Sequence, residues 1–301
     1  MDLDLPSVFV RNIRSAFPAD GERWLRELPS LLERAAGRWD LSLGEPFLLS
    51  YNYVCAARRR DGPQAVLKIG VPNRELAGEI NALRLYAGRG ACRLLEADAD
   101  EGMLLLERLQ PGTMLATLTD DDRATGIAAD VLRTIRRPAP PPDGFITLRS
   151  WFDALQKLRP RFDGGTGPFP EHAVSAVEDL LPGLFAASTG DVLLHGDFHQ
   201  FNILLSERGW LAIDPKGVIG PAGYEVGPLL MNPWGKIPPE AAAVRRTRRR
   251  LDILSGRLDL DRRQLRDWAL CHSLLSAWWD LAEDGSGGEY SRAWIEIFLK
   301  V

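Results

Sequence analysis

The feature that most constrains this chain is a polar loop enclosed by three short apolar runs. The segment covers residues 192–217 and reads VLLHGDFHQFNILLSERGWLAIDPKG. Its apolar runs break the helical pattern on either side and are typical of short strands. Asp197 and Asn202 lie between the first two runs, and Asp214 follows the third. The sequence therefore predicts a cluster of polar side chains on loops that short strands hold rigidly.

These three side chains suit the transfer of a phosphoryl group. An amide oxygen and a carboxylate are hard ligands, so Asn202 and Asp214 could hold Mg²⁺ together with phosphate oxygens and water. Asp197 lies at the mouth of the same loop, where a carboxylate can accept a hydroxyl proton and orient that oxygen towards phosphorus. The structural alternative is that Asp197 and Asn202 only cap turns, as Asp and Asn commonly do.

Four polar neighbours of these residues have more than one interpretation. His195 is expected to be a packed, hydrogen-bonded support of the loop and not a proton carrier. His199 lies inside the loop and could approach a substrate. Lys216 follows the predicted metal ligand and could either touch phosphate or brace the loop. Glu225 is expected to tie the segment down, in preference to binding substrate.

The composition excludes several classes of protein. The chain has 301 residues, enough for two domains or one large one, and a formal net charge of −4, whereas a nucleic-acid binder normally carries a basic excess. No apolar run approaches the length of a membrane span, and the acidic start lacks the features of a signal peptide. The three cysteines are too widely spaced for a disulfide framework or a zinc site. We therefore expect a cytoplasmic protein that binds neither nucleic acid nor membranes.

The chain divides into a β-rich part and a mainly helical part. Apolar spacing predicts a leading helix at about 20–39, and Pro111-Gly112 ends the β-rich part, so we expect lobes at 1–109 and 110–301. In the first lobe we expect three antiparallel strands, which include residues 47–49, 53–56 and 64–69. A helix at about 73–88 and two further strands, which include 93–96 and 103–107, should follow.

The second lobe is predicted to be helical around the polar loop. Apolar residues recur at helical spacing over 261–282. The arginine-rich run at 245–250 resembles a nucleic-acid patch when taken alone. In an acidic chain, and between helical patterns, we interpret it as a solvated helix face.

The polar loop resembles the catalytic core of the aminoglycoside phosphotransferase family, within the protein-kinase-like fold. His195-Gly196-Asp197 followed by Asn202 is similar to that family's H-G-D-x-x-x-x-N, and Ile213-Asp214 is similar to its D-F-G aspartate. The longer string from Ile213 to Glu225 resembles the streptomycin 6-phosphotransferase and hydroxyurea kinase branch. The motifs cover about residues 40–235. The resemblance implies an α+β, bilobal fold with a small antiparallel N-lobe sheet and a mostly helical C-lobe.

The resemblance also implies a nucleotide site in the first lobe. Such a fold needs a strand lysine for the phosphates and a helix glutamate to position it. Lys68 is the only lysine in the first 150 residues. The following helix offers Glu75 and Glu79. Glu79 is preferred because its place in this helix matches that of the family's glutamate. Glu107 and Leu109 fall where the family's hinge offers backbone groups to adenine.

The sequence departs from protein kinases in two respects. The turn at residues 49–53 contains no glycine, so the G-x-G-x-x-G loop that covers the phosphates is absent, and backbone groups of Ser50 or Asn52 could replace it. The motifs H-R-D, D-F-G and A-P-E are also absent. These differences argue against a protein substrate.

We therefore expect a small-molecule kinase that uses ATP and Mg²⁺. The resemblance implies an aminoglycoside acceptor of streptomycin type, and hydroxyurea, a sugar or a non-catalytic nucleotide-binding module are the alternatives. The acidic balance suits a cationic acceptor. Candidate partners for its charges lie at the end of the long helix: Asp280, Glu283 and Asp284. The sequence carries no signal for the oligomeric state, and we expect a monomer.

Overall fold

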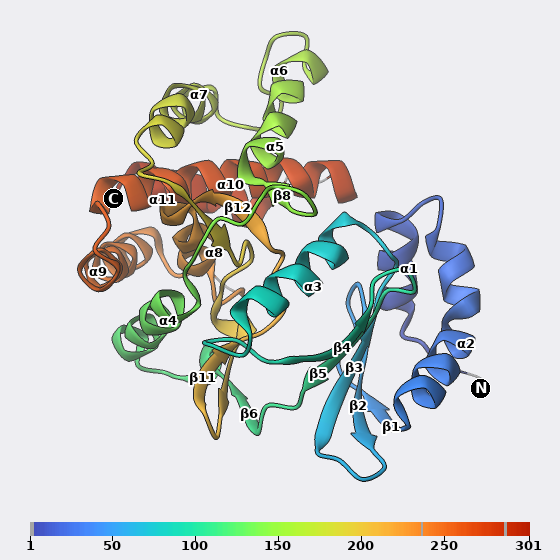
Figure 1. The fold of residues 1–301 in the computed structure, drawn as a ribbon. Coiled ribbons are helices and arrows are strands. Elements are labelled where there is room, and N and C mark those ends of the chain that lie inside the picture. Colours follow the sequence, from blue (N-terminus) through green and yellow to red (C-terminus); the bar gives the residue numbers. More distant parts are fainter. Residues whose placement is uncertain (1–2, 236, 286–287) are drawn as a thin grey trace.

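The first part of the chain folds around a five-stranded antiparallel sheet with the strand order β1-β2-β3-β5-β4 (Figure 1). The computed structural model describes residues 3–235, 237–285 and 288–301. The strands are β1 (Leu41–Pro46), β2 (Tyr53–Arg59), β3 (Gln64–Ile69), β4 (Leu94–Asp98) and β5 (Met103–Glu107). The helices are α1 (Ser7–Ala16), α2 (Gly21–Trp39) and α3 (Arg74–Tyr86).

The two faces of this sheet pack against different helices. Because side chains alternate along a strand, Leu67 and Leu105 face one side, where they join a core with α1 and α2. Leu104 and Leu106 face the other side and pack against α3. Lys68, opposite Leu104 in the register of β3 and β5, lies on the α3 side. The sheet thus directs the predicted phosphate-binding lysine towards the helix that carries its predicted partner.

The first strand differs from the prediction. Residues 47–49 lie in the loop between β1 and β2, and Leu48 is 99% exposed. The strand is instead Leu41–Pro46, an edge strand in which only Leu41 and Leu43 alternate with small or polar residues before the register shifts, a pattern too short to recognise. Helix α1 was not expected, whereas the predicted helix at 20–39 is confirmed as α2, which continues through Pro29.

The second part contains two smaller sheets and most of the helices. One sheet has the order β11-β10-β6 and the other β7-β9-β12-β8. The strands are β6 (Pro111–Met114), β7 (Arg137–Pro138), β8 (Ile146–Thr147), β9 (Asp191–Leu194), β10 (Ile203–Ser206), β11 (Gly209–Ala212) and β12 (Val218–Pro221). The helices are α4 (Asp121–Ile135), α5 (Leu148–Phe152), α6 (Leu158–Arg161), α7 (Glu171–Ala186), α8 (Val226–Met231), α9 (Glu240–Leu258), α10 (Arg262–Asp284) and α11 (Glu289–Leu299).

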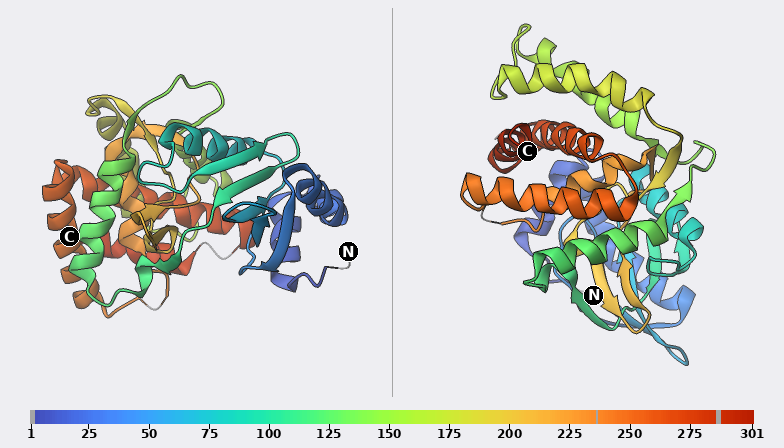
Figure 2. Two further views of the ribbon diagram at one scale, coloured as in Figure 1. Left: turned by 60° about the horizontal axis from the view of Figure 1, so that its bottom comes forward. Right: turned by 90° about the vertical axis from the view of Figure 1, so that its left-hand side faces the viewer.

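Helix α10 is the centre of the second part. It contacts α7, α8, α9 and α11, and α7 lies over it on the outside (Figure 2). Its apolar residues are buried with those of its neighbours in one large core that includes Trp268 and Trp294. Within the described residues, no helix is long and apolar enough to span a membrane. Cys55, Cys92 and Cys271 are buried and unpaired.

The arginine-rich run on α9 is only partly a solvated helix face. Arg245, Arg248 and Arg249 are exposed, as expected. Arg250 is buried, pairs with Asp121 and donates to the carbonyl oxygen of Asn232 (2.6 Å). The charged head of Arg250 therefore binds α9 to α4 and to the end of α8, and the prediction was wrong for this residue.

The two parts meet in an apolar cluster. Leu76, Ile80 and Leu83 of α3 pack with Leu104 of β5 and with Leu211 of β11. Strand β6, which follows the first sheet, pairs with β10 in the second part. We keep the division at residues 109 and 110 as a proposal.

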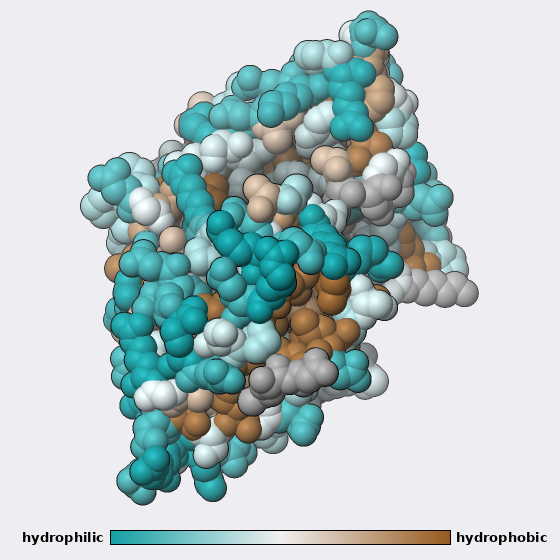
Figure 3. Space-filling view, turned by 90° about the vertical axis from the view of Figure 1, so that its right-hand side faces the viewer, coloured by the Kyte–Doolittle hydropathy of each residue, from teal (hydrophilic) through white to brown (hydrophobic). Residues whose placement is uncertain are grey.

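Seen from the side that carries α1 and α2, the surface is largely hydrophilic, with a hydrophobic area near its middle (Figure 3).

Candidate active site

Buried groups hold the loop after β9 in place. His195 is fully buried, and its Nε2 lies 2.9 Å from the carbonyl oxygen of Ile213. Burial lowers the pKa of His195 to about 4, so the ring is neutral. Gly196 has φ +85°, and a Cβ there would meet Val218 at 2.9 Å, so glycine is required on both counts. His195 is therefore packed and hydrogen-bonded beneath the loop, as the sequence predicts.

Glu225 holds the same loop through the backbone. Its Oε1 accepts a hydrogen bond from the N–H of Gly196 (2.9 Å). Its Oε2 is buried and has no hydrogen-bond partner in the described part of the chain. Burial raises the pKa of Glu225 to about 7, although the backbone donors of Gly196 and His195 oppose this shift. Glu225 thus ties the segment down from a fully enclosed position.

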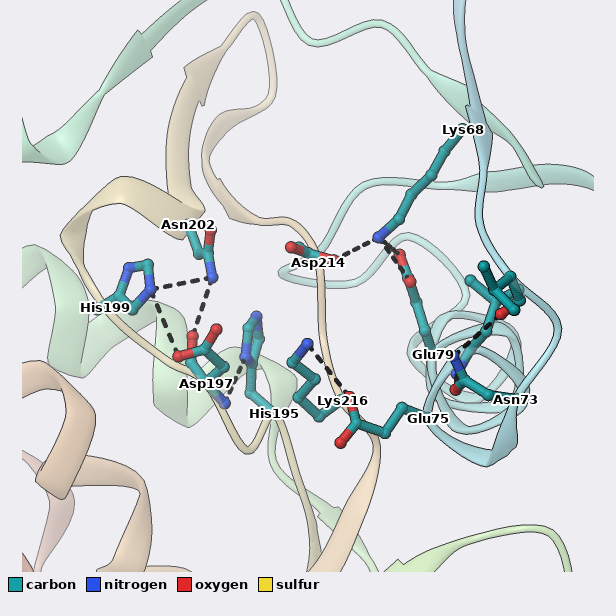
Figure 4. A network of polar contacts seen from close by, with 12 residues as sticks. Lys68, Asn73, Glu75, Glu79, His195, Asp197, His199, Asn202, Asp214 and Lys216 are labelled. Atoms are coloured by element: carbon teal, nitrogen blue, oxygen red, sulfur yellow. Dashed lines mark hydrogen bonds and ion pairs between the residues drawn. The ribbon is translucent and has the colours of Figure 1, made fainter. Parts of the chain in front are cut away.

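Asn202 and Asp214 are brought together by the β10–β11 hairpin. These strands pair antiparallel from Ile203 opposite Ala212, and the N–H of Ile213 donates to the carbonyl oxygen of Asn202 (2.9 Å). The two predicted metal ligands therefore lie at the same open end of the hairpin (Figure 4). Asp214 has φ +59°, a left-handed conformation that is uncommon for a residue with a side chain. Such conformations concentrate at functional sites.

Lys68, Glu79 and Asp214 form one ion-pair network. The Nζ of Lys68 lies 2.8 and 2.6 Å from the two carboxylate oxygens of Glu79, and it also donates to Asp214. Burial opposes the charge on Lys68, but Asp214 and Glu79 outweigh it and raise the pKa of Lys68. Burial also opposes the charge on Asp214, yet Lys68 and Lys216 hold its pKa well below the usual range. The preferred partner, Glu79, is thus the one that contacts the lysine.

Two glycines allow α3 to approach this network. A Cβ on Gly78 would lie 2.7 Å from the carbonyl oxygen of Lys216, and one on Gly217 would lie 2.3 Å from the carbonyl oxygen of Gly78. Both neighbours are backbone atoms, which have little freedom to move aside. The absence of side chains here lets α3 lie directly on the segment after Asp214. Glu79, the next residue on α3, is positioned by this contact.

Asp197 lies beside His199 and Asn202. The Nε2 of His199 is 3.4 Å from Oδ1 of Asp197, and the amide of Asn202 donates to the carbonyl oxygen of Asp197 (3.0 Å). Burial opposes the charge of Asp197, but the bond with His199 and the charge of Lys216 lower the pKa of Asp197 to about 2. The Asp197 carboxylate is therefore ionised at neutral pH and partly accessible to a substrate.

The predicted hinge has a side-chain role as well. The carboxylate of Glu107 pairs with Arg208 at 2.5 Å, and the N–H of Glu107 donates to the carbonyl oxygen of Arg93 (2.9 Å). The N–H of Glu107 is thus engaged within the first part of the molecule. Leu109 is buried in the cluster that joins the two parts of the molecule. Both adenine contacts stay predictions.

The predicted acceptor contacts belong to the last turns of α10. Asp280 accepts a hydrogen bond from the hydroxyl of Ser291 (3.0 Å) at the start of α11. The side chains of Glu283 and Asp284 lie outside the described part of the chain. The contacts of these residues with a substrate stay predictions.

The donor set fits a magnesium ion bound together with phosphates. Because its Nδ2 donates to Asp197, the amide oxygen of Asn202 is free to act as a ligand. Lys68 engages Oδ1 of Asp214, which leaves Oδ2. One amide oxygen and one carboxylate are too few for a protein-only metal site, and the described residues contain no cluster of three or more metal-binding side chains. They suffice for Mg²⁺, which keeps water and substrate phosphate as its other ligands.

Two contacts near the site were not predicted. Glu75 of α3, the residue passed over in favour of Glu79, has its carboxylate 3.6 Å from Nζ of Lys216. Arg208, in the β10–β11 turn, pairs with Glu107 and donates to the carbonyl oxygen of Gly88 (2.7 Å). The helical spacing of Glu75 and Glu79 signals that both face one side, but nothing in the sequence marks Arg208.

A lysine–glutamate pair beneath a sheet and a carboxylate loop on a helical lobe define a phosphotransferase of the protein-kinase-like class. The chain belongs to the aminoglycoside/hydroxyurea antibiotic resistance kinase family, whose pattern matches residues 38–285. It is 35% identical over 292 residues to a streptomycin 6-kinase of Streptomyces glaucescens, covering 94% of this chain and 92% of that protein. It is 36% identical over 273 residues to a hydroxyurea phosphotransferase of Kitasatospora aureofaciens, covering 89% and 77%.

Solved structures support the same fold. The structure of an aminoglycoside phosphotransferase in ternary complex with ADP and hygromycin B matches with a TM-score of 0.63 at 16% identity, covering 89% of this chain and 97% of that one. The expected α+β kinase-like architecture is thus confirmed, and the chain is a kinase of small molecules by family.

Proposed function

We propose that this protein transfers the γ-phosphoryl group of ATP to a hydroxyl group of an aminoglycoside of streptomycin type. The observation that carries the proposal is the meeting of Lys68, Asp197 and Asp214 in one site, in a chain whose relatives include a streptomycin 6-kinase over nearly its whole length. We further propose that it acts as a monomer in the cytoplasm, where ATP is supplied and its unpaired cysteines remain reduced.

In this proposal the first lobe binds the nucleotide. Lys68 contacts the phosphates and is kept in place by Glu79. The carbonyl oxygen of Glu107 and the N–H of Leu109 bind the edge of adenine. Asn202 and Asp214 hold Mg²⁺, which neutralises phosphate charge when bound.

Asp197 orients the acceptor. Its pKa of about 2 makes it a weak base, so it holds the acceptor hydroxyl by a hydrogen bond and takes the proton late in the transfer. The bond from the γ-phosphorus to the bridging oxygen breaks as the acceptor oxygen bonds to phosphorus. The loose transition state needs little basic assistance, so positioning and electrostatics supply most of the rate enhancement.

The acceptor is the least constrained part of the proposal. An ammonium- or guanidinium-bearing substrate suits the predicted contacts Asp280, Glu283 and Asp284, and His199 beside Asp197. Hydroxyurea is the second candidate because one relative of similar identity is named as a hydroxyurea phosphotransferase. A sugar acceptor or a non-catalytic nucleotide-binding module stay weaker alternatives.

Replacement of the proposed base tests the reaction. Asp197→Asn should lower kcat by at least about 10³-fold, because it removes the charge that orients the acceptor, while ATP affinity measured by calorimetry should change little. Asp191→Asn, an exposed aspartate on β9, is the control and should keep full activity. Near-native turnover by Asp197→Asn would contradict the assigned role.

A screen of acceptors tests the substrate. ADP release should rise with streptomycin in the presence of Mg²⁺ and should stop when the metal is removed with EDTA. Mass spectrometry of the product should show one added phosphoryl group. Turnover of hydroxyurea, or of a sugar, without turnover of any aminoglycoside would overturn the streptomycin assignment and leave the kinase assignment standing.

A further inference from the structure

We propose that Lys216 is a second phosphate-binding lysine, whose ammonium group leaves Glu75 and contacts the γ-phosphoryl group during transfer. This role presupposes the proposed kinase reaction and adds a catalytic residue to it. The sequence left Lys216 with two possibilities, a phosphate contact or a brace, and the geometry favours the first.

The backbone of Lys216 is fixed beside the catalytic loop. Its N–H donates to the carbonyl oxygen of His195 (2.6 Å). Because His195 lies two residues before Asp197 and Lys216 lies two residues after Asp214, this bond joins the two segments that carry the site. The side chain extends into the space between His195 and Glu75 (Figure 4). Its charge is close enough to stabilise both the Asp197 and the Asp214 carboxylates. Lys216 therefore lies beside the catalytic loop, with the proposed base and the proposed metal ligand both within reach of its charge.

The two lysines of the site are held very differently. Lys68 makes short hydrogen bonds with Glu79 and Asp214, and its side chain is almost fully buried. Lys216 lies 3.6 Å from Glu75, which is longer than a hydrogen bond, and both side chains are partly exposed. A loose, solvated ion pair costs little to break. Lys68 is thus a fixed cation, whereas Lys216 can move.

A further cation beside Asp197 would serve the proposed chemistry. In the transition state, negative charge spreads over the three equatorial oxygens of the transferred group, and cations placed around them stabilise it. Lys68, held by Glu79 and Asp214, approaches the phosphates from the side away from Asp197 (Figure 4). As the bridging bond breaks and the acceptor oxygen bonds to phosphorus, the acceptor proton passes to Asp197 and Lys216 remains protonated, donating to a γ-oxygen.

Two variants separate the phosphate contact from a brace. Lys216→Met and Glu75→Gln both break the same ion pair, but only the first removes the cation. The readout is the dissociation constant of ADP and of a non-hydrolysable ATP analogue with an imido bridge, measured by calorimetry with Mg²⁺. In Lys216→Met we expect affinity for the analogue to fall about 10-fold or more relative to ADP, the loss of one charge-assisted hydrogen bond. In Glu75→Gln the ratio of the two dissociation constants should stay as in the wild type or change in favour of analogue binding.

The possible outcomes are distinct. If both variants lose the two nucleotides equally, or if Lys216→Met keeps the wild-type ratio, Lys216 is a brace and the proposal is overturned. If wild-type protein binds neither nucleotide, the proposed function itself fails. Lys216→Gln gives the same comparison should the methionine variant not fold, and Lys216→Arg, which keeps the charge, should retain part of the preference for the analogue.

Discussion

At the scale of single residues, the catalytic loop depends on the carboxyl group of Glu225. This group accepts the N–H of Gly196, one position before Asp197, from a fully buried position. Its raised pKa means that the folded state holds a proton that the unfolded chain releases. A residue that only positions a loop thereby makes stability depend on pH.

The sign of this dependence can be tested with Glu225→Gln. Between the ordinary carboxyl pKa and about 7, folded protein binds more protons than unfolded protein, so the free energy of unfolding should fall as pH rises through this window. The glutamine variant lacks this contribution, which is on the order of 3 kcal/mol at most. Urea unfolding at pH 5 and pH 7.5 should show the variant gaining stability relative to wild type at the higher pH. An equal difference at both pH values would contradict the proton-linked role.

At the scale of elements, α3 is positioned by a close backbone contact in addition to its apolar side chains. Gly78 and Gly217 approach so closely that neither position has room for a Cβ. The same helix is also held by Arg74, which donates to the carbonyl oxygen of Phe145 (2.8 Å). A helix docked in this way keeps Glu79 at Lys68 even without nucleotide.

Gly78→Ala should displace α3 and separate Glu79 from Lys68. We expect a loss of stability of about 1–3 kcal/mol from overpacking and a fall in kcat larger than the change in acceptor KM. Gly37→Ala is the matched control, because it is also a helical glycine but has no atom within 4 Å of the added carbon. That change should be neutral or stabilise by up to about 1 kcal/mol. Equal behaviour of the two variants in unfolding and kinetic assays would refute the docking role.

The elements also show how far the sequence could predict the molecule. Asp197, Asn202 and Asp214 were identifiable because short strands and a local motif fix their relative positions. The choice of Glu79 over Glu75 was possible from the resemblance to the family, whose glutamate holds the same place in the helix. The pairing of Glu75 with Lys216 could not be predicted, since it joins residues far apart in sequence whose contact depends on how α3 docks.

Other elements had no sequence signal. Strand β1 lies at the edge of its sheet and its hydrophobic alternation is limited to Leu41 and Leu43, so the longer apolar run at residues 47–49 was mistaken for it. Arg250 could not be distinguished from its exposed neighbours, because its partner Asp121 lies on another helix. Helix propensity and charge patterns describe single segments, and these contacts are made between segments.

At the scale of the whole molecule, the two parts are joined by Arg208. This residue of the second part pairs with Glu107, at the end of the first sheet, and donates to carbonyl oxygens of Gly88 and Ala91. One guanidinium thus binds the segment between α3 and β4 at two points and the end of β5 at the same time. Planar, multidentate contacts of this kind are particular to arginine.

Arg208→Ala should loosen the connection between the parts. We expect a loss of about 1–2 kcal/mol, or roughly 2–6 °C in Tm, and a higher KM for ATP, because the hinge is no longer fixed. Arg208→Lys should recover little of this loss, since an ammonium cannot satisfy the carboxylate and both carbonyls together. Differential scanning calorimetry and ATP kinetics measure the two effects, and recovery by lysine would show that charge alone matters.

The contact of Gly78 with Gly217 has a mechanical consequence for the whole molecule. Any rotation of the first sheet against the helical part that preserves this contact must have its axis close by, so the two glycines act as a pivot. Near a pivot displacements are small, and the distances among Lys68, Glu79 and Asp214 would hardly change. The loop of residues 47–52, where Leu48 projects into solvent, belongs to the sheet and would move with it.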